Sequence, residues 1–263
     1  MRTAGAEIDK AAIPTCGIAV MAKASIAGRS KTRLVPPLTF AEAAQCNTAF
    51  LRDIADNILA ASTEASIAGY IAYSPAHARP FFQANLPREI GLIEACYPTL
   101  GECLDDTIAQ LLERGHRSAV VLNSDSPTLP TSLLVETARV LARPGDRAVL
   151  GPALDGGYYL LGLKAIHHRL FEDITWSTER VAQQTLERAA ELDLPVHMLP
   201  AWYDVDDVAG LEMLRAELLE GRSFAPDLCP AQPRHTRALI QSLVETSDLK
   251  DRLSLNALRR AAE

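Results

Sequence analysis

The sequence predicts an α/β protein built on a mainly parallel central sheet. Three observations point to this fold class. Short apolar runs alternate with helical stripes along most of the chain, which is the pattern of βαβ units. The stripes are long enough to form crossover helices, and 48% of the 263 residues are hydrophobic, which is enough for a large core. In open sheets of this kind, ligands lie beyond the carboxyl ends of the strands.

The first half of the chain shows this alternation clearly. Cys16 to Ala22 is an apolar run that predicts a buried strand, and the basic loop after it ends at Pro36-Pro37. A helical stripe starts at Phe40, and Thr39 is its expected N-cap. The next expected elements are strand 67–73, a short helix through Phe81-Phe82, strand 91–95, a helix over 104–112 and strand 119–122.

The second half continues the pattern and then breaks it. The expected elements are helix 132–142, strand 148–151, strand 158–163, helix 177–192, strand 195–199 and helix 208–219. A Pro-rich segment at 226–233 interrupts the pattern before helical character returns. We therefore expect a disordered leader at 1–13, a main domain at 14–223, and a Pro-rich linker with a helical tail at 224–263. The tail would pack on the main domain or on a partner, with a homo-oligomer as one such arrangement.

Composition excludes several classes of protein. A net charge of −7 and a pI near 5.4 argue against nucleic-acid binding, which needs a basic face. No apolar run approaches the ~18 residues of a membrane span, so no membrane partner is expected. Five cysteines, an odd number without metal-site spacing, indicate reduced, buried thiols. Glu7 and Asp9 make the leader unlike a signal peptide, so we expect a cytoplasmic protein.

The basic loop after the first strand is the main candidate for a binding site. Four cations, Lys23, Arg29, Lys31 and Arg33, lie within 11 residues, and Gly28 lets the backbone approach a ligand. Such a loop can neutralise a polyphosphate through charge-assisted hydrogen bonds. A solvated surface loop is the alternative, but this loop follows a buried strand in an acidic protein.

Acidic residues follow at two further positions. Asp125, in Ser124-Asp125-Ser126-Pro127, comes directly after an apolar strand and could hold Mg²⁺; a plain turn explains it equally well. Asp204 and Asp206 share a side if their segment is extended, which would supply a second carboxylate. A helix N-cap at Asp206 or Asp207 accounts for one of these acids but not for all of them.

Two segments could contact a second substrate. Asp155-Gly156-Gly157 joins two expected strands, so a hairpin turn is the ordinary explanation, and a substrate-facing role is an even alternative. Trp176 and Ser177 are similar, because Trp176 could be a core residue and Ser177 a helix cap.

Together these motifs resemble the DUF2064 family of the GT-A nucleotide-diphospho-sugar transferase superfamily. The resemblance rests on Lys23…Gly28-Arg29-x-Lys31-Thr32-Arg33-Leu34, Ser124-Asp125-Ser126-Pro127, Gly151-Pro152…Asp155-Gly156-Gly157-Tyr158-Tyr159, Trp176-Ser177-Thr178 and Tyr203-Asp204-Val205-Asp206. It implies a Rossmann-like three-layer α/β/α domain with a helical C-terminal extension, so that residues 14–223 would be a GT-A-like nucleotide-binding catalytic domain.

The resemblance also implies roles for individual residues. Asp125, with Asp204 or Asp206, would bind Mg²⁺ or Mn²⁺. The nucleotide would contact Ala22, Lys23, Gly28, Arg29, Lys31, Arg33 and Ser124. The second substrate would contact Asp155, Gly156, Gly157, Tyr158, Trp176 and Ser177.

The Lys31-Thr32-Arg33-Leu34 segment is also similar to the start of phospholactate guanylyltransferases, which use a nucleoside triphosphate. Two positions depart from the patterns: Cys103 stands where the family has Arg, and Ser25 replaces a proline in the basic loop.

Our expectation is a Mg²⁺-dependent nucleotidyltransferase acting on a phosphate- or phosphonate-type small acceptor, with Lys31, Arg33 and Asp125 as catalytic residues. The alternatives are a glycosyltransferase that uses a nucleotide sugar and, more remotely, a non-catalytic nucleotide-binding protein.

Overall fold

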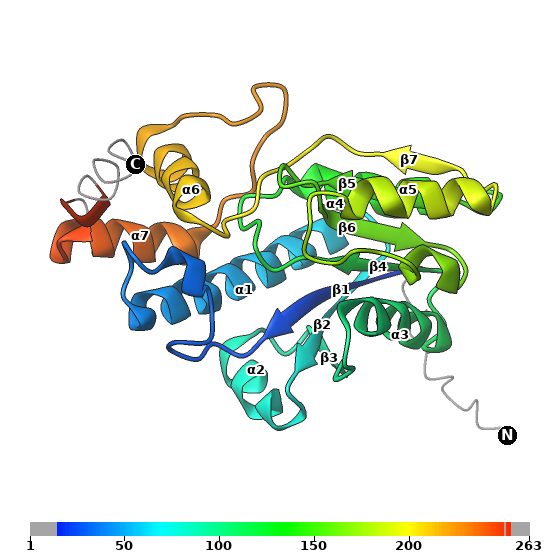
Figure 1. The fold of residues 1–263 in the computed structure, drawn as a ribbon, viewed down its shortest axis with the longest axis horizontal. Coiled ribbons are helices and arrows are strands. Elements are labelled where there is room, and N and C mark those ends of the chain that lie inside the picture. Colours follow the sequence, from blue (N-terminus) through cyan, green and yellow to red (C-terminus); the bar gives the residue numbers. More distant parts are fainter. Residues whose placement is uncertain (1–14, 250, 254–263) are drawn as a thin grey trace, which may run out of the picture.

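A computed structural model describes residues 15–249 and 251–253 of the chain. Its centre is a seven-stranded sheet with the order β3-β2-β1-β4-β6-β5-β7 (Figure 1). All neighbouring strands pair in parallel except β6, which is antiparallel to both β4 and β5. The expected mainly parallel sheet is therefore confirmed. The strands are β1 (Cys16–Lys23), β2 (Ile67–Ser74), β3 (Gly91–Glu94), β4 (Ser118–Leu122), β5 (Ala148–Pro152), β6 (Tyr158–Leu163) and β7 (Val196–Met198).

Helices cover both faces of the sheet and give it three layers. One hydrophobic cluster joins the sheet to α1, α4, α6 and α7, and a second cluster joins its other face to α3 and α5. This arrangement confirms the expected three-layer α/β/α architecture. The helices are α1 (Phe40–Ser62), α2 (Arg79–Asn85), α3 (Leu100–Glu113), α4 (Thr131–Leu141), α5 (Val181–Glu191), α6 (Val208–Glu220) and α7 (Arg234–Thr246). No helix in the described ranges is both long enough and apolar enough to cross a membrane.

Local capping explains where several helices begin. Thr39 forms a capping box with Glu42 at the start of α1, as the sequence predicts. The carboxylate of Asp207 accepts a hydrogen bond from the Gly210 N–H at the start of α6, so Asp207 is the cap of this helix. The expected helix from residue 177 was wrong at its start: Ser177 has a φ of 63°, which an α-helix does not accommodate, and α5 begins at Val181.

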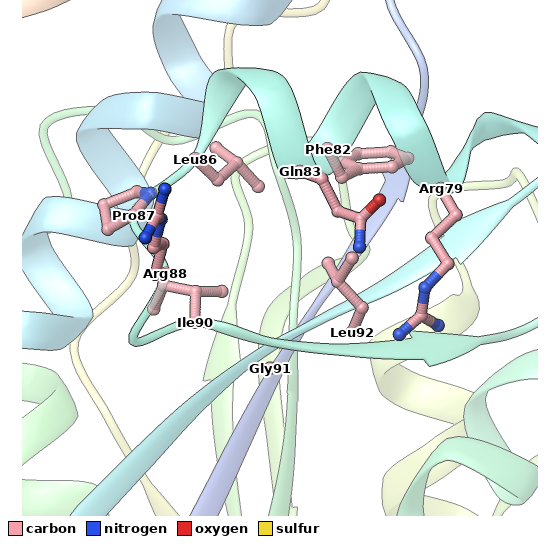
Figure 2. A pocket seen from close by; sticks show the side chains of 9 residues that line it. All are labelled: Arg79, Phe82, Gln83, Leu86, Pro87, Arg88, Ile90, Gly91 and Leu92. Atoms are coloured by element: carbon pink, nitrogen blue, oxygen red, sulfur yellow. The ribbon is translucent and has the colours of Figure 1, made fainter.

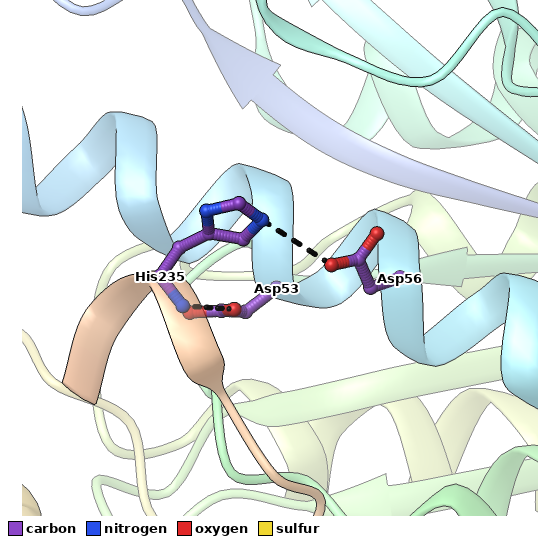
Figure 3. A group of neighbouring side chains, drawn as sticks. All are labelled: Asp53, Asp56 and His235. Carbon is purple, nitrogen blue, oxygen red and sulfur yellow. Dashed lines mark hydrogen bonds and ion pairs between the residues drawn. The ribbon is translucent and has the colours of Figure 1, made fainter. Parts of the chain in front are cut away.

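The helical tail packs on the main domain. Helix α7 lies against α1 (Figure 1), and Ile240 and Leu243 are buried in the same core as the sheet. Asp53 of α1 accepts a hydrogen bond from the His235 N–H at 2.9 Å (Figure 3) and another from the Thr236 N–H at 2.7 Å. These two N–H groups lie in the first turn of α7, where a helix has no partners of its own. Asp53 therefore caps the tail helix from a distant part of the chain.

The leader at 1–13 lies outside the described residues, and an oligomer formed through the tail stays a prediction. All five cysteines are free thiols, but only Cys16 and Cys46 are buried. Cys96 and Cys229 are exposed, so the expectation of buried thiols was wrong for them. Both follow the end of a regular element or lie in the Pro-rich segment, where little chain is available to cover them.

Candidate functional site

The basic loop leaves the carboxyl end of β1 and is held in shape by its own hydroxyl groups. Ser30 is buried; its Oγ donates to the Ala24 carbonyl and accepts from the Ile26 N–H. The Ser25 hydroxyl accepts hydrogen bonds from the side chains of Asn47 and Thr48 of α1. Ser25, which stands where the resembling family has a proline, thus ties the loop to the helix that follows it.

The side chains of this loop divide into an exposed group and one buried cation. Lys23, Arg29 and Arg33 are exposed, whereas Ala22 is buried at the end of β1. Gly28 has a φ of 79°, and a Cβ placed on it would meet nothing within 4 Å, so its backbone is open to a ligand.

Lys31 is the exception in the loop, because its side chain is only 6% exposed. Its Nζ lies 2.6 Å from Asp125 Oδ1 and 2.9 Å from Asp206 Oδ1, and it donates to the Val205 carbonyl at 2.9 Å. The ammonium also lies over the Phe50 ring, 5.4 Å from its centroid. Burial alone would lower the pKa of Lys31, but the charges of Asp125 and Asp206 outweigh it and raise the pKa. Lys31 is therefore a firmly protonated cation between two carboxylates.

The two carboxylates meet because their backbone segments are hydrogen-bonded to each other. The Val205 N–H donates to the Asp125 carbonyl at 2.8 Å, and the Ser126 hydroxyl donates to the Tyr203 carbonyl at 2.9 Å. The loop after β4 and the segment before α6 thus form one unit. The Ser124 hydroxyl donates to Asp125 Oδ1 and fixes that carboxylate further.

Burial raises the pKa of Asp204 to about 6, and the nearby charges of Asp155, Asp206 and Asp125 raise it in the same direction. Asp204 and Asp155 are therefore close enough to interact, although Asp155 comes from the turn between β5 and β6. For Asp206, burial raises the pKa, but Lys31 and Arg33 outweigh it and the net shift is downward. The site thus holds one acid pair, Asp125 and Asp206, that shares the single positive charge of Lys31, and a second acid pair, Asp155 and Asp204, without such a partner in the described residues.

The expected second-substrate residues are only partly brought together. A Cβ on Gly156 would lie 2.1 Å from the Glu179 carbonyl, so the turn at 155–157 packs directly on the segment that follows Ser177. The Gly157 N–H donates to Asp155 Oδ1, which is the ordinary hairpin turn considered above. Trp176 packs its indole on Gly101 in the first turn of α3, and Ser177 is exposed.

Tyr158 does not present its hydroxyl to solvent. The oxygen is buried and has no hydrogen-bond partner in the described part of the chain, and burial raises the pKa of the phenol. Its ring packs with the cluster that joins the sheet to α3 and α5.

The donors around Lys31 suit a divalent cation. Asp125, Asp206 and the Val205 carbonyl offer only oxygen atoms, which Mg²⁺ and Mn²⁺ prefer, and the side chains of Asp125 and Asp206 are 27% and 41% exposed. Two carboxylates from separate segments already converge on one positive charge. The Lys31 ammonium occupies the space between them, so the expected metal would bind through the remaining carboxylate oxygens of Asp125 and Asp206 together with Asp204. The oxygen donors of these three acids fit Mg²⁺ or Mn²⁺ on those terms.

Sequence reasoning missed two contributors to this site. The Val205 carbonyl contacts Lys31 through the backbone, so its residue type carries no signal. Asn47 donates to the Lys23 carbonyl and to Ser25 from a buried position on α1. A polar residue within an otherwise apolar helical stripe was the available signal for Asn47.

Two other features of the molecule are separate from this site. A cavity of about 510 Å³ lies between α2 and β3, and no site residue lines it (Figure 2). Asp53, Asp56 and His235 lie close enough together to suggest a metal ligand set. Both oxygens of Asp53, however, accept N–H groups of α7, so this cluster is explained by helix capping.

The fold and this arrangement define an α/β protein with a Rossmann-like, GT-A-like fold and an acidic site with one buried lysine at the carboxyl ends of its strands. The model of the family described as "Uncharacterized protein conserved in bacteria (DUF2064)" matches residues 57–178, which confirms the resemblance to DUF2064 over that region. A search of curated proteins finds no match to the chain.

Solved structures agree with this class. A protein from Desulfovibrio desulfuricans G20, assigned provisionally as a nucleotide-diphospho-sugar transferase, is 25% identical with a TM-score of 0.76. The match covers 92% of this chain and 97% of that one. A cytidylyltransferase from Leptospira borgpetersenii serovar Hardjo-bovis shares the fold, with 10% identity, a TM-score of 0.50, and coverage of 89% and 96%.

Proposed function

We propose that this chain is a nucleotide-using transferase, and that its reaction is nucleotidyl transfer from a nucleoside triphosphate to a small acceptor. The observation that carries the proposal is the charge arrangement at the end of β1. Lys23, Arg29 and Arg33 are exposed, and within residues 15–249 and 251–253 none of them forms an ion pair. These three cations share their loop with a buried Lys31 that is already paired with acids. A triphosphate matches such a surplus of cations better than a diphosphate does.

The chemistry follows from these positions. An acceptor oxygen attacks the α-phosphorus in line, a new P–O bond forms, and the bond to the β-phosphate bridging oxygen breaks to release pyrophosphate. Arg33, with Lys23 and Arg29, would stabilise the charge that develops on the transferring and leaving phosphates. Lys31, whose ammonium is bound by Asp125, Asp206 and the Val205 carbonyl, would hold the two acids in place. Asp125 and Asp206, with Asp204 beside them, would hold Mg²⁺ or Mn²⁺, which when bound would neutralise phosphate oxygens.

The acceptor would lie against the turn at 155–157 and the segment containing Trp176 and Ser177. A phosphate or phosphonate acceptor is already an anion at neutral pH, so its oxygen needs no general base to attack. The negative charge of the acceptor would then have to be neutralised by the loop cations and the metal ion.

Glycosyl transfer from a nucleotide sugar is the second candidate, and two observations favour it. The similar Desulfovibrio protein carries that provisional assignment. Asp155 and Asp204 also place negative charge where an acceptor would lie, and the raised pKa of Asp204 reflects it. Such a pair suits a neutral hydroxyl acceptor, from which a carboxylate can accept the proton.

Product analysis distinguishes the two reactions. The purified protein is incubated with each NTP, Mg²⁺ or Mn²⁺, and a panel of phosphate, phosphonate and hydroxyl acceptors, and pyrophosphate is measured. Acceptor-dependent pyrophosphate release that is lost in Asp125→Asn supports nucleotidyl transfer. Turnover of UDP- or GDP-sugars without pyrophosphate release would establish the second candidate instead. Nucleotide-induced thermal stabilisation with no turnover of either donor would leave only the non-catalytic alternative.

A further inference from the structure

The C-terminal segment contacts the stretch of chain that carries the loop cations. Arg252 forms a bidentate pair with Glu42, from Nη1 to Oε2 and from Nη2 to Oε1, both at 2.9 Å. Its Nη1 also donates to the Pro37 carbonyl. Pro37 lies between Arg33 and the start of α1, so this arginine ties the connection that follows the cations to the first turn of the helix.

Glu42 serves two partners at once. Its Oε2 accepts the Thr39 N–H at 2.7 Å in the capping box of α1 and also accepts from Arg252. Hydrogen bonding from Arg252 is the main cause that holds the pKa of Glu42 below its usual range. The side chains of Arg252 and Glu42 are 21% and 14% exposed, so solvent screens this pair less than a surface pair.

Arg252 is itself held in place. Leu249 and Leu253 on either side of it are buried in the main core, at 1% and 5% exposure. The Ser247 hydroxyl also accepts from Arg252. The backbone of Arg252 is therefore anchored to the core, and its guanidinium can restrain the loop.

We propose that Arg252 is a positioning residue for the basic loop, holding the connection between Arg33 and α1 so that Arg33 is arranged for polyphosphate before it binds. This inference rests on the proposed function of that loop. Ser247, Leu249 and Arg252 then contribute to the site, although they lie outside residues 57–178, which match the family model. Preorganisation of this kind reduces the ordering cost that a ligand would otherwise meet on binding.

The test measures loop order and anion binding separately. The amides of Leu34, Val35 and Leu38 are hydrogen-bonded within the loop, so hydrogen exchange reports on its order directly. Inorganic triphosphate is the binding probe, because it engages the cations without a base or an acceptor. In Arg252→Gln we expect faster exchange at these three amides and a roughly 5- to 10-fold weaker affinity for triphosphate, about 1 kcal/mol.

Four further variants, one of them a control, make the test decisive. Glu42→Gln keeps a capping box, since glutamine also serves at that position, but loses the ion pair. It should reproduce the effect of Arg252→Gln, and the double variant should add little to either. Arg252→Lys should recover part of the affinity. Arg234→Gln is the matched control: Arg234 is a tail arginine paired with Asp56 at 3.0 Å, is 74% exposed, and should change neither readout.

The outcomes separate the inference from the proposed function. If wild type binds triphosphate and Arg252→Gln binds it equally well with unchanged exchange at 34–38, the positioning role is refuted. A lowered melting temperature with unchanged loop exchange and affinity refutes it too, because Arg252 would then only anchor the tail. If wild type itself does not bind triphosphate, the proposed function of the loop fails, whatever the exchange data show.

Discussion

Replacing Lys31 with methionine tests the centre of the site. The change removes a cation that is 2.6 Å from Asp125 and 2.9 Å from Asp206, and methionine keeps much of the apolar stem. Loss of one partner from a fully buried pair costs about 3–5 kcal/mol. Both carboxylates retain some exposure and can be solvated, so we expect Lys31→Met to lower the free energy of unfolding by about 2–3 kcal/mol at pH 7.

The pH dependence of this loss has a definite sign. Lys31 and Arg33 keep the pKa of Asp206 below its ordinary value against the effect of burial. The stabilisation from the ionised acid is therefore present at neutral pH and lost as the pH falls through the lowered pKa. The difference between wild type and Lys31→Met should be largest at pH 7 and should shrink in acid, as the acids lose their charge.

Urea denaturation at pH 7 and at pH 4 measures both quantities, and a loss of 2–3 kcal/mol corresponds to about 4–12 °C in melting temperature for a chain of this size. Lys23→Met is the control, because Lys23 is exposed and should change stability by no more than about 0.5 kcal/mol. Mg²⁺ or Mn²⁺ should stabilise Lys31→Met more than wild type, since a cation is then missing between the two acids. Equal stabilities of Lys31→Met and wild type at pH 7 would refute the assigned ion pairs.

Three further changes have expected outcomes. Asp204→Asn should be about 1–2 kcal/mol more stable than wild type at pH 8 and equal to it near pH 4. The pKa of Asp204 is raised from 3.8 to about 6, so ionisation of this acid destabilises the folded wild type as the pH rises across that interval. Gly156→Ala should destabilise by more than about 2 kcal/mol, since the new methyl group would meet the Glu179 backbone. Asp53→Asn should cost about 1–3 kcal/mol and speed exchange in α7, because one buried acceptor is lost.

For each of these three predictions, one result would contradict the reasoning behind it. For Asp204, the reasoning fails if the stability gain is the same at pH 4 and pH 8. Gly28→Ala is the control for Gly156, because Gly28 also has a positive φ but open space around it; equal losses would show that the contact with Glu179 is unimportant. For Asp53, unchanged exchange at the start of α7 would show that the cap is not needed.

The fold followed from local pattern because its strands and helices carry strong periodicity. The apolar run after Thr15 became β1, and the capping box at Thr39 marked the start of α1. The start of α5 could not be predicted, because the left-handed backbone at Ser177 depends on tertiary packing rather than on serine itself. Local pattern thus located the elements more reliably than their ends.

Lys31, Asp125 and Asp206 were all candidates from the sequence, and the structure places them together in an arrangement that the sequence did not indicate. The resemblance assigned Lys31 to the nucleotide and Asp125 to a metal, and no local rule indicates that Lys31 lies directly between two acids. Arg252 is separated from Pro37 by 215 positions, so no pattern along the chain connects them. Interactions of that range appear only when the chain has folded.

The antiparallel strand β6 separates two kinds of connection in the described sheet, and they differ in how well they tolerate sequence change. Strands β1, β2, β3 and β4 depend on crossover helices, so a change in one connection alters the packing of a whole layer. The connection from β5 to β6 is a short surface turn that contains Asp155. The Leu154 and Asp155 side chains of this turn are exposed and can be exchanged without shifting a neighbouring strand, whereas Gly156 is held against the Glu179 backbone. On the proposed function, relatives that keep the basic loop would then differ in their acceptor mainly through these two exposed positions.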